Sequence, residues 1–254
     1  MSTMSPFPGR MGVLRQAIAR IEATADHSRA SGHNPGGIVE ILPARPGDAT
    51  AACGYALTLA IAAAGAEGTI LWIGEDFVWR ERGAPYGPGL RAHGIDPARL
   101  ALVRASGPRE ALWALEEGLK STACAAVVGE IWDAARHCDL MATRRLTLAA
   151  RAGSALGLLI YSAPVAEALS TAARERFEVA TTQGRAISSA GRRRPIPEAP
   201  AWRLRVLKSR PAVGVAAPSD SEKIIVWSAF GDGIPISEGR SSAALSFPRH
   251  LKRA

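Results

Sequence analysis

The residues best placed to bind a ligand follow the first apolar run of the sequence. Gly37–Leu42 is typical of a buried strand, and Pro43–Thr50 is the turn that leads from it into an alanine-rich helix. In α/β proteins such a turn presents backbone N–H groups and a helix N-terminus to an anion. The position therefore indicates either a phosphate-binding loop or an ordinary strand-to-helix turn.

The side chains in this turn lack the chemistry of a working phosphate loop, which ends in glycine, lysine and a hydroxyl residue. With Gly47 as the glycine, Asp48 and Ala49 take the lysine and hydroxyl places. Shifted by one residue, Ala49 and Thr50 take these places, and Asp48 replaces the glycine. Neither register has a lysine, an aspartate repels a triphosphate, and Pro43 removes an N–H group near the start of the loop. We expect the position of a nucleotide site without its chemistry.

Acidic residues close two other strand patterns. Glu130 lies near the end of residues 123–131, a segment similar to the strand that carries a metal-positioning acid in nucleotide enzymes. Glu75 and Asp76 follow the apolar run at residues 69–74. Glu130 is either a Mg²⁺ ligand or a solvated residue at a strand end, and Glu75 with Asp76 is a candidate general base and its partner. Without a lysine-bearing loop, we expect these acids to be structural.

No other residues form a convincing catalytic or metal site. His137 and Cys138 are adjacent, but neighbouring side chains rarely point together, and no orienting acid is identifiable. The five histidines show no ligand spacing, so neither a metal nor another cofactor is expected. The three cysteines form no CxxC motif, which is typical of a protein in the reducing cytoplasm.

Positive charge is concentrated near the end of the chain. Residues 1–184 carry 18 basic and 18 acidic side chains, whereas residues 185–254 carry 13 and 5. A neutral body with a basic extension indicates an anionic partner, and the alternative is a solvated surface that aids solubility. The side chains expected to contact a partner or the phosphates of nucleic acid are Arg185, Arg192, Arg193, Arg194, Arg203, Arg205, Lys208 and Arg210.

Two further features suggest contacts with other proteins. Leu14, Ile18 and Ile21 recur at i, i+4 and i+7, which predicts a short amphipathic helix near the N-terminus. Trp79 lies in a polar connector and Trp202 in the basic extension, so both are candidates for contacts with a partner.

The elements that must position these residues alternate between strands and helices. This alternation predicts an α/β fold with a mostly parallel sheet flanked by helices. The expected strands are residues 37–42, 69–74, 100–104, 123–131 and 156–161. The expected helices are residues 51–64, 108–119 and 139–152, with one more near 87–93 in a polar connector.

After residue 164 the pattern changes to short alternating strands, expected at 177–181, 201–208 and 223–227. In the second of these, Trp202, Leu204 and Val206 would face one way and Arg203, Arg205 and Leu207 the other. We therefore expect three regions. They are an N-terminal helix and linker at 1–36, a core at 37–182, and a basic, strand-rich extension at 183–254 with a flexible end.

Composition fits one large domain, or one domain with an appendage. The chain has 254 residues, of which 47% are hydrophobic and 21% charged, so wholesale disorder is excluded. No run of 18 apolar residues occurs, and no membrane span is expected. The N-terminus lacks the apolar core of a signal peptide. We expect a cytoplasmic protein.

The order of these motifs resembles the RecA core. The strand at 37–42, its loop and alanine-rich helix are followed by TILWIGED at 69–76 and LRAHGIDPARL at 90–100. More specifically, GPREALWALEEGLKSTACAAVVGEIWD and DLMATRRLTLAARAGSALGLLIY resemble the ImuA family, the RecA-like accessory proteins of bacterial mutagenesis operons. The resemblance covers residues 11–182, is looser at 201–210, and does not extend beyond residue 211.

The resemblance to ImuA implies an accessory role in mutagenic translesion DNA synthesis during the SOS response. Members of the family work with a catalytically inactive Y-family polymerase homologue and an error-prone replicative-type polymerase, and RecA is a further candidate partner. The C-terminal region is expected to contact the Y-family partner, with DNA reached directly or through partners. The N-terminal helix lies where RecA places its inter-subunit helix, so Leu14, Ile18 and Ile21 are expected to dock on a RecA-type neighbour or a second copy of the chain.

Because the loop lacks its lysine, we expect no ATPase activity, but two other functions stay open. One is a RecA-like ATPase with an unorthodox loop, in which Glu130 or Asp76 positions a metal ion or water. The other is a DNA-binding architectural module driven by the basic extension, with steep salt dependence.

Overall fold

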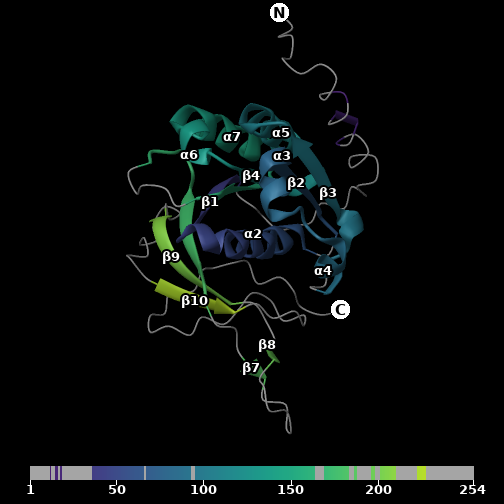
Figure 1. The fold of residues 1–254 in the computed structure, drawn as a ribbon. Coiled ribbons are helices and arrows are strands. Elements are labelled where there is room, and N and C mark those ends of the chain that lie inside the picture. Colours follow the sequence, from purple (N-terminus) through teal and green to yellow (C-terminus); the bar gives the residue numbers. More distant parts are fainter. Residues whose placement is uncertain are drawn as a thin grey trace, which may run out of the picture.

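The computed structural model has an α/β fold built on one large sheet (Figure 1). It describes residues 36–65, 67–92, 95–163, 169–182, 186–187, 196–197, 201–209 and 222–226, together with helical residues 12, 15, 16 and 18 near the N-terminus. The expected mostly parallel sheet flanked by helices is confirmed.

Six parallel strands form the body of the sheet, and two antiparallel strands extend it. The order across the sheet is β10-β9-β6-β1-β5-β4-β2-β3. The parallel strands are β1 (Gly37–Pro43), β2 (Thr69–Glu75), β3 (Leu100–Ala105), β4 (Cys124–Ile131), β5 (Leu156–Tyr161) and β6 (Glu175–Thr181). The antiparallel ones are β9 (Ala201–Ser209) and β10 (Glu222–Val226), and a separate pair is formed by β7 (Ala186–Ile187) and β8 (Ile196–Pro197).

Helices cover both faces of the sheet, which explains why its central strands are continuously apolar. One face packs against α2 (Ala49–Ala64), α3 (Asp76–Arg82) and α4 (Gly87–Ala92). The other packs against α5 (Pro108–Lys120), α6 (Ala134–His137) and α7 (Leu140–Gly153). Short 3-10 turns lie at η1 (Pro46–Asp48) and η2 (Pro97–Arg99). In Figure 1, α5 and α7 lie on one side of the sheet and α2 lies on the other.

Local sequence signals fix the ends of the α5 and α7 helices. Pro108 occupies the first turn of α5, and the Glu110 carboxylate accepts a 2.7 Å hydrogen bond from the Ser106 amide. Asp139 caps α7 by accepting a 2.8 Å hydrogen bond from the Ala142 amide. The helix ends at Ser154, which adopts the left-handed conformation with φ 59°.

Among the described residues, the structure adds two short helices, α3 and α6, to those expected. The polar connector after β2 contains α3 as well as α4. In α3, Val78 and Trp79 are buried, whereas Phe77 and Arg80 are exposed. The connector is therefore partly core.

One described helical segment, Pro46–Ala64, is long and apolar enough to cross a membrane by length and composition alone. Half of it is buried against the rest of the protein. Tyr55, Ala56 and Ala60 belong to the core between this segment and the sheet. Its apolar composition is therefore explained by packing in a two-sided α/β fold.

Candidate functional site

The loop after β1 lies at the carboxyl edge of the sheet, where ligands of α/β proteins bind. The strand β1 lies between β5 and β6, and the chain leaves it through η1 into α2. Arg45, Pro46, Gly47 and Thr50 are exposed at this edge, whereas Asp48 and Ala49 are buried. The structure thus places the expected slot where a nucleotide loop would be.

The Asp48 carboxylate links this loop to β6. Its side chain is only 2% exposed. One oxygen accepts a 3.0 Å hydrogen bond from the Thr181 amide at the end of β6, and the other pairs with Arg45 Nε at 3.1 Å. Burial alone would raise the pKa of Asp48, but these hydrogen bonds and the Arg45 charge outweigh it and hold the pKa below its ordinary value. The carboxylate therefore stays charged and ties the loop to β6.

The backbone of the loop offers few N–H groups to an anion. Pro43 and Pro46 have none. Three other amides are already used within the protein. Ala44 donates to the Val179 carbonyl at 2.9 Å, Asp48 donates to that of Arg45 at 2.9 Å, and Ala49 donates to that of Pro46. A phosphate cradle needs several such groups pointing outward, so the residues present do not fit a nucleoside triphosphate.

Glu130 lies under the α2 layer and not at an open edge. Its side chain accepts hydrogen bonds from Trp72 Nε1 at 2.5 Å and Trp79 Nε1 at 3.2 Å, and the Cys53 thiol lies 3.6 Å away. Burial raises the pKa of Glu130, although these hydrogen bonds and the Arg82 charge oppose the rise. The sequence suggested either a Mg²⁺ ligand or a solvated residue at a strand end. In the structure, Glu130 is instead a buried acceptor for two indole N–H groups.

The two acids at the end of β2 differ in burial, since Glu75 is buried and Asp76 is partly exposed. Glu75 is 4% exposed and accepts a 2.9 Å hydrogen bond from the Trp132 amide. Burial raises the pKa of Glu75. Asp76 points outward and forms ion pairs with Arg80 at 3.0 Å and Arg104 at 2.7 Å. The two carboxylates therefore have different partners, Glu75 the Trp132 amide and Asp76 two arginines, which does not support their interpretation as a base and its orienting acid.

The sequence analysis did not identify a buried ion pair between β1 and β6. Glu40 is fully buried and accepts a 2.8 Å hydrogen bond from Arg176 Nε on β6. The Tyr161 hydroxyl and the Thr171 hydroxyl each donate to Glu40 at 2.9 Å. An acid in the middle of the apolar run GIVEIL is the signal that indicates such a partner, because a buried charge needs one.

The candidate nucleophile Cys138 is not activated in the structure. Cys138 is buried, and burial raises the pKa of its thiol well above the ordinary value. This is opposite to the activation that a nucleophile needs. Within the described residues no group of three or more His, Cys, Asp and Glu side chains is arranged to hold a metal ion.

The basic candidates are only partly described. Arg203 and Arg205 share one face of β9 and Trp202, Leu204 and Val206 the other, as the alternation predicted. The Arg205 guanidinium is held by two 3.0 Å hydrogen bonds to Glu178, and Lys208 Nζ donates to the Thr171 carbonyl at 2.7 Å. The other candidates lie outside the described residues: Arg185, Arg192, Arg193, Arg194 and Arg210.

The two tryptophans that were candidates for partner contacts, Trp79 and Trp202, are buried, so the structure does not support that role. Trp202 is 4% exposed and packs edge-on against Tyr55. Trp79 is 6% exposed and lies against Gly74, where any side chain would collide with the indole. Both pack on the α2 face of the sheet, where tertiary contacts absorb their apolar area.

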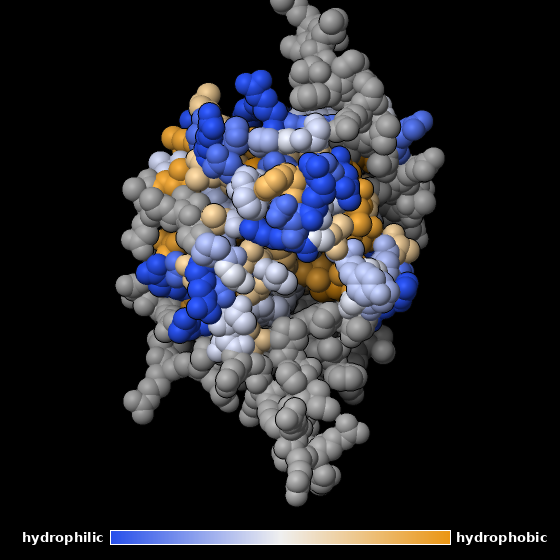
Figure 2. Space-filling view, viewed as in Figure 1, coloured by the Kyte–Doolittle hydropathy of each residue, from blue (hydrophilic) through white to orange (hydrophobic). Residues whose placement is uncertain are grey.

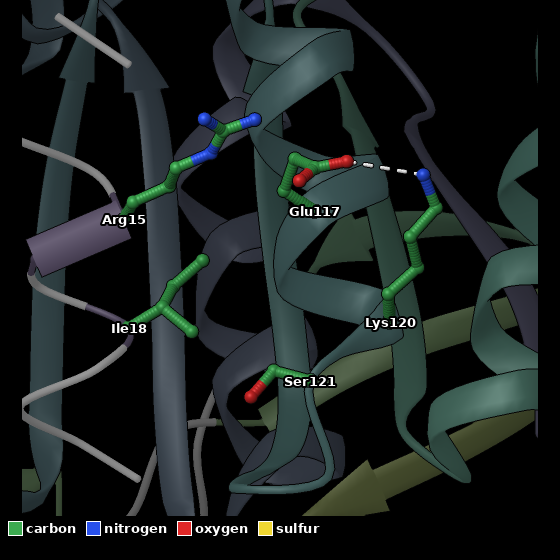
Figure 3. Close-up of a pocket in the computed structure, with 5 residues that line it drawn as sticks. All are labelled: Arg15, Ile18, Glu117, Lys120 and Ser121. Carbon is green, nitrogen blue, oxygen red and sulfur yellow. Dashed lines mark hydrogen bonds and ion pairs between the residues drawn. The ribbon is translucent and has the colours of Figure 1, made fainter. Parts of the chain in front are cut away.

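Of the N-terminal candidates, the structure describes Ile18, which lies beside the end of α5. Ile18 is half-buried and packs on the core formed by α5 to α7. Together with Arg15 it faces Glu117, Lys120 and Ser121 at the end of α5, around a hollow of about 260 Å³ (Figure 3). Leu14 and Ile21 lie outside the described residues. Ile18 thus has contacts within its own chain.

Comparison with known proteins does not assign a family. No protein-family model and no curated protein matches this chain. Among solved structures, SulA from Pseudomonas aeruginosa is similar at 22% sequence identity with a TM-score of 0.37, covering 49% of this chain and 96% of that one. A TM-score of this size does not establish a shared fold, and this similarity supports no functional conclusion.

Proposed function

We propose that this chain is a non-catalytic, RecA-like accessory factor in SOS-induced mutagenic translesion synthesis, acting in the cytoplasm. In this proposal it docks a catalytically inactive Y-family polymerase homologue, and it contacts RecA or an error-prone replicative-type polymerase directly or through that partner. The observation that carries the non-catalytic part is the buried Asp48 carboxylate, bonded to the Thr181 amide where a phosphate loop needs a lysine.

The link to mutagenic synthesis is supported by the resemblance of residues 107–133 and 139–161 to the ImuA family. These segments contain α5, β4, α7 and β5, which are adjacent in the fold (Figure 1). The resemblance therefore lies in a contiguous part of the protein and not in scattered fragments.

The proposed partner contacts use both ends of the chain. The basic residues between Arg185 and Arg210 would meet the Y-family partner, and Leu14, Ile18 and Ile21 would meet a RecA-type neighbour or a second copy. Because Ile18 already packs on its own core, a partner would extend an existing apolar contact.

The alternative of an unorthodox ATPase receives less support. Its candidate metal-positioning acids, Glu130 and Asp76, have other partners in the folded chain. The alternative of a DNA-binding architectural module stays open. Arg205 and Lys208 are engaged with Glu178 and the Thr171 carbonyl, but most of the basic candidates lie outside the described residues.

The proposal is tested by DNA damage in the host. A deletion strain is irradiated, and drug-resistant mutants are counted among the survivors. We expect induced mutation to collapse, wild-type protein to restore it, and a variant with Arg192, Arg193 and Arg194 changed to Glu to fail. Arg91→Glu, at an exposed position of α4, is the control for a charge reversal elsewhere on the surface and should restore it. Unchanged induced mutation in the deletion strain would overturn the proposal.

A further inference from the structure

The outer face of α7 exposes large apolar side chains. Leu140, Met141 and Leu148 are 48%, 69% and 59% exposed, although the inner face of the same helix is buried at Leu146 and Ala150. Single exposed leucines are common, but three such residues on one 14-residue helix form a patch of the kind that marks interaction sites. Sheet packing does not explain them.

A groove beside this face adds to the patch. It runs between α5 and α7, has a volume of about 320 Å³, and has an apolar floor of Leu112, Trp113, Ala142 and Leu146. Arg109 and the Arg145–Glu116 ion pair form its polar rim. Hydrophilic and hydrophobic residues lie interspersed over the region where α5 and α7 lie (Figure 2).

The charges around the groove are mainly positive. Helix α7 has three arginines, Arg144, Arg145 and Arg151, and no acidic residue. On α5 the two acids near the rim are already paired: Glu116 with Arg145 and Lys120, and Glu117 with Lys120. In the part of the chain that the structure describes, Arg144, Arg151 and Arg109 are exposed and form no ion pair. The face therefore combines apolar anchors with uncompensated positive charge.

We propose that this face of α7 and the α5–α7 groove bind an acidic amphipathic helix of a partner protein. The apolar side of the helix would pack on Met141, Leu148 and Trp113, and its carboxylates would meet the uncompensated arginines. This docking site is a separate inference and does not depend on the proposed function.

Other occupants fit the surface less well. Nucleic acid would use the arginines but not the exposed Met141 and Leu148, because phosphate contacts need charge and donors. A second copy joined by two-fold symmetry would place the same arginines against each other. An acidic helix with an apolar side matches both the exposed apolar side chains and the positive charge of this face.

The test uses the full chain and a synthetic helical peptide with leucines on one face and glutamates on the other. The peptide carries a fluorescent label, and binding is followed by anisotropy. We expect saturable binding that a matched peptide with lysine in place of glutamate does not show. Labelled oligo-dT and phosphatidylglycerol vesicles are tested in parallel and should not compete.

Substitutions then locate the site. Met141→Glu with Leu148→Glu should weaken the peptide by at least about tenfold, and Arg144→Glu with Arg151→Glu should do the same. The controls are the combined Leu102→Glu and Arg91→Glu variant and each of its single substitutions, since Leu102 is 45% exposed on β3 and Arg91 is exposed on α4. Since all these residues are exposed, the variants should keep the wild-type melting temperature. Absence of saturable binding, equal loss in the controls, or displacement by oligo-dT or vesicles would overturn the proposal.

Discussion

The Asp48 carboxylate accepts a hydrogen bond from the Thr181 amide and pairs with Arg45, and it does so at the place where a lysine would hold phosphate. The Asp48 side chain is only 2% exposed, and a buried carboxylate is compatible with a stable fold only when it has such hydrogen-bond and ion-pair partners. The residue therefore contributes to the fold in a loop whose position is typical of ligand binding.

The role of Asp48 predicts a pH-dependent contribution to stability. Its folded pKa lies below the ordinary value of 3.8, so its contribution is present above that value and is lost as pH falls through the lower folded pKa. Asp48→Asn should lower the free energy of unfolding by about 2 kcal/mol near neutral pH, with a smaller difference at about pH 3. Urea denaturation at both pH values measures this. Asp133→Asn, on an exposed acid, should change little.

The buried Glu40–Arg176 pair predicts a larger effect. Arg176→Met leaves the Glu40 carboxylate buried without its cation, which should cost about 3–5 kcal/mol of unfolding free energy. The combined Glu40→Leu and Arg176→Met variant should recover most of it, because no buried charge is left unpaired. Glu178→Ala breaks the more exposed pair with Arg205 and should cost less than about 1 kcal/mol. A mild effect of Arg176→Met alone would contradict this account.

The sequence shows that this loop has no lysine, but it does not predict which group contacts Asp48, the aspartate in the lysine place. Asp48 and Thr181 lie 133 positions apart, and their contact depends on β6 pairing with β1. The same holds for Glu130, whose indole partners Trp72 and Trp79 come from two different elements. Residue types suggest chemistry, whereas only the fold decides whether a carboxylate faces solvent or a buried donor.

At the scale of elements, continuous apolar runs such as TILWIG predict the buried strands well, since strands covered on both faces need no alternation. Helix α3 was not predicted because its seven residues are too few to show a clear period. Its stability comes from tertiary contacts, with Trp79 packed over Gly74 and bonded to Glu130.

Two glycines should respond differently to substitution by alanine. Gly153 lies where α7 packs on α5, and Gly47 lies in the exposed loop after β1. A methyl group on Gly153 would lie 2.1 Å from the Leu119 carbonyl oxygen, so Gly153→Ala must displace the end of α5. It should lower the free energy of unfolding by about 1–3 kcal/mol. A methyl group on Gly47 would lie in open space, and the backbone of Gly47 does not have a positive φ. Gly47→Ala should therefore be neutral or stabilising by less than about 1 kcal/mol. Thermal unfolding of both variants checks this, and equal destabilisation would contradict it.

At the scale of the whole molecule, the alternation of strands and helices predicts the class of fold, but not the order of the strands. That order depends on pairing between distant segments, and β9 illustrates it. Although β9 lies in the basic extension, it pairs with β6 and buries Trp202 and Leu204 in the main core. The region around 201–209 is therefore part of the same sheet as residues 37–182.

This integration predicts how truncations behave. A chain ending at residue 184 lacks β9 and exposes the core surface that Trp202 and Leu204 cover, which should cost more than about 5 kcal/mol of unfolding free energy. A chain ending at residue 226 keeps β9 and β10 and should melt close to the full chain. Circular dichroism melting compares the two, and a wild-type transition in the shorter chain would refute the prediction.

The most direct test of the central claim, that this protein works by binding other molecules and not by nucleotide chemistry, is calorimetric titration of Mg-ATP into the full chain. With three of its loop amides used internally, two prolines in the loop and a carboxylate in the lysine place, we predict no saturable binding of ATP at millimolar concentration. The contradicting result would be saturable, Mg²⁺-dependent binding that disappears in Glu130→Ala while that variant keeps the wild-type fold.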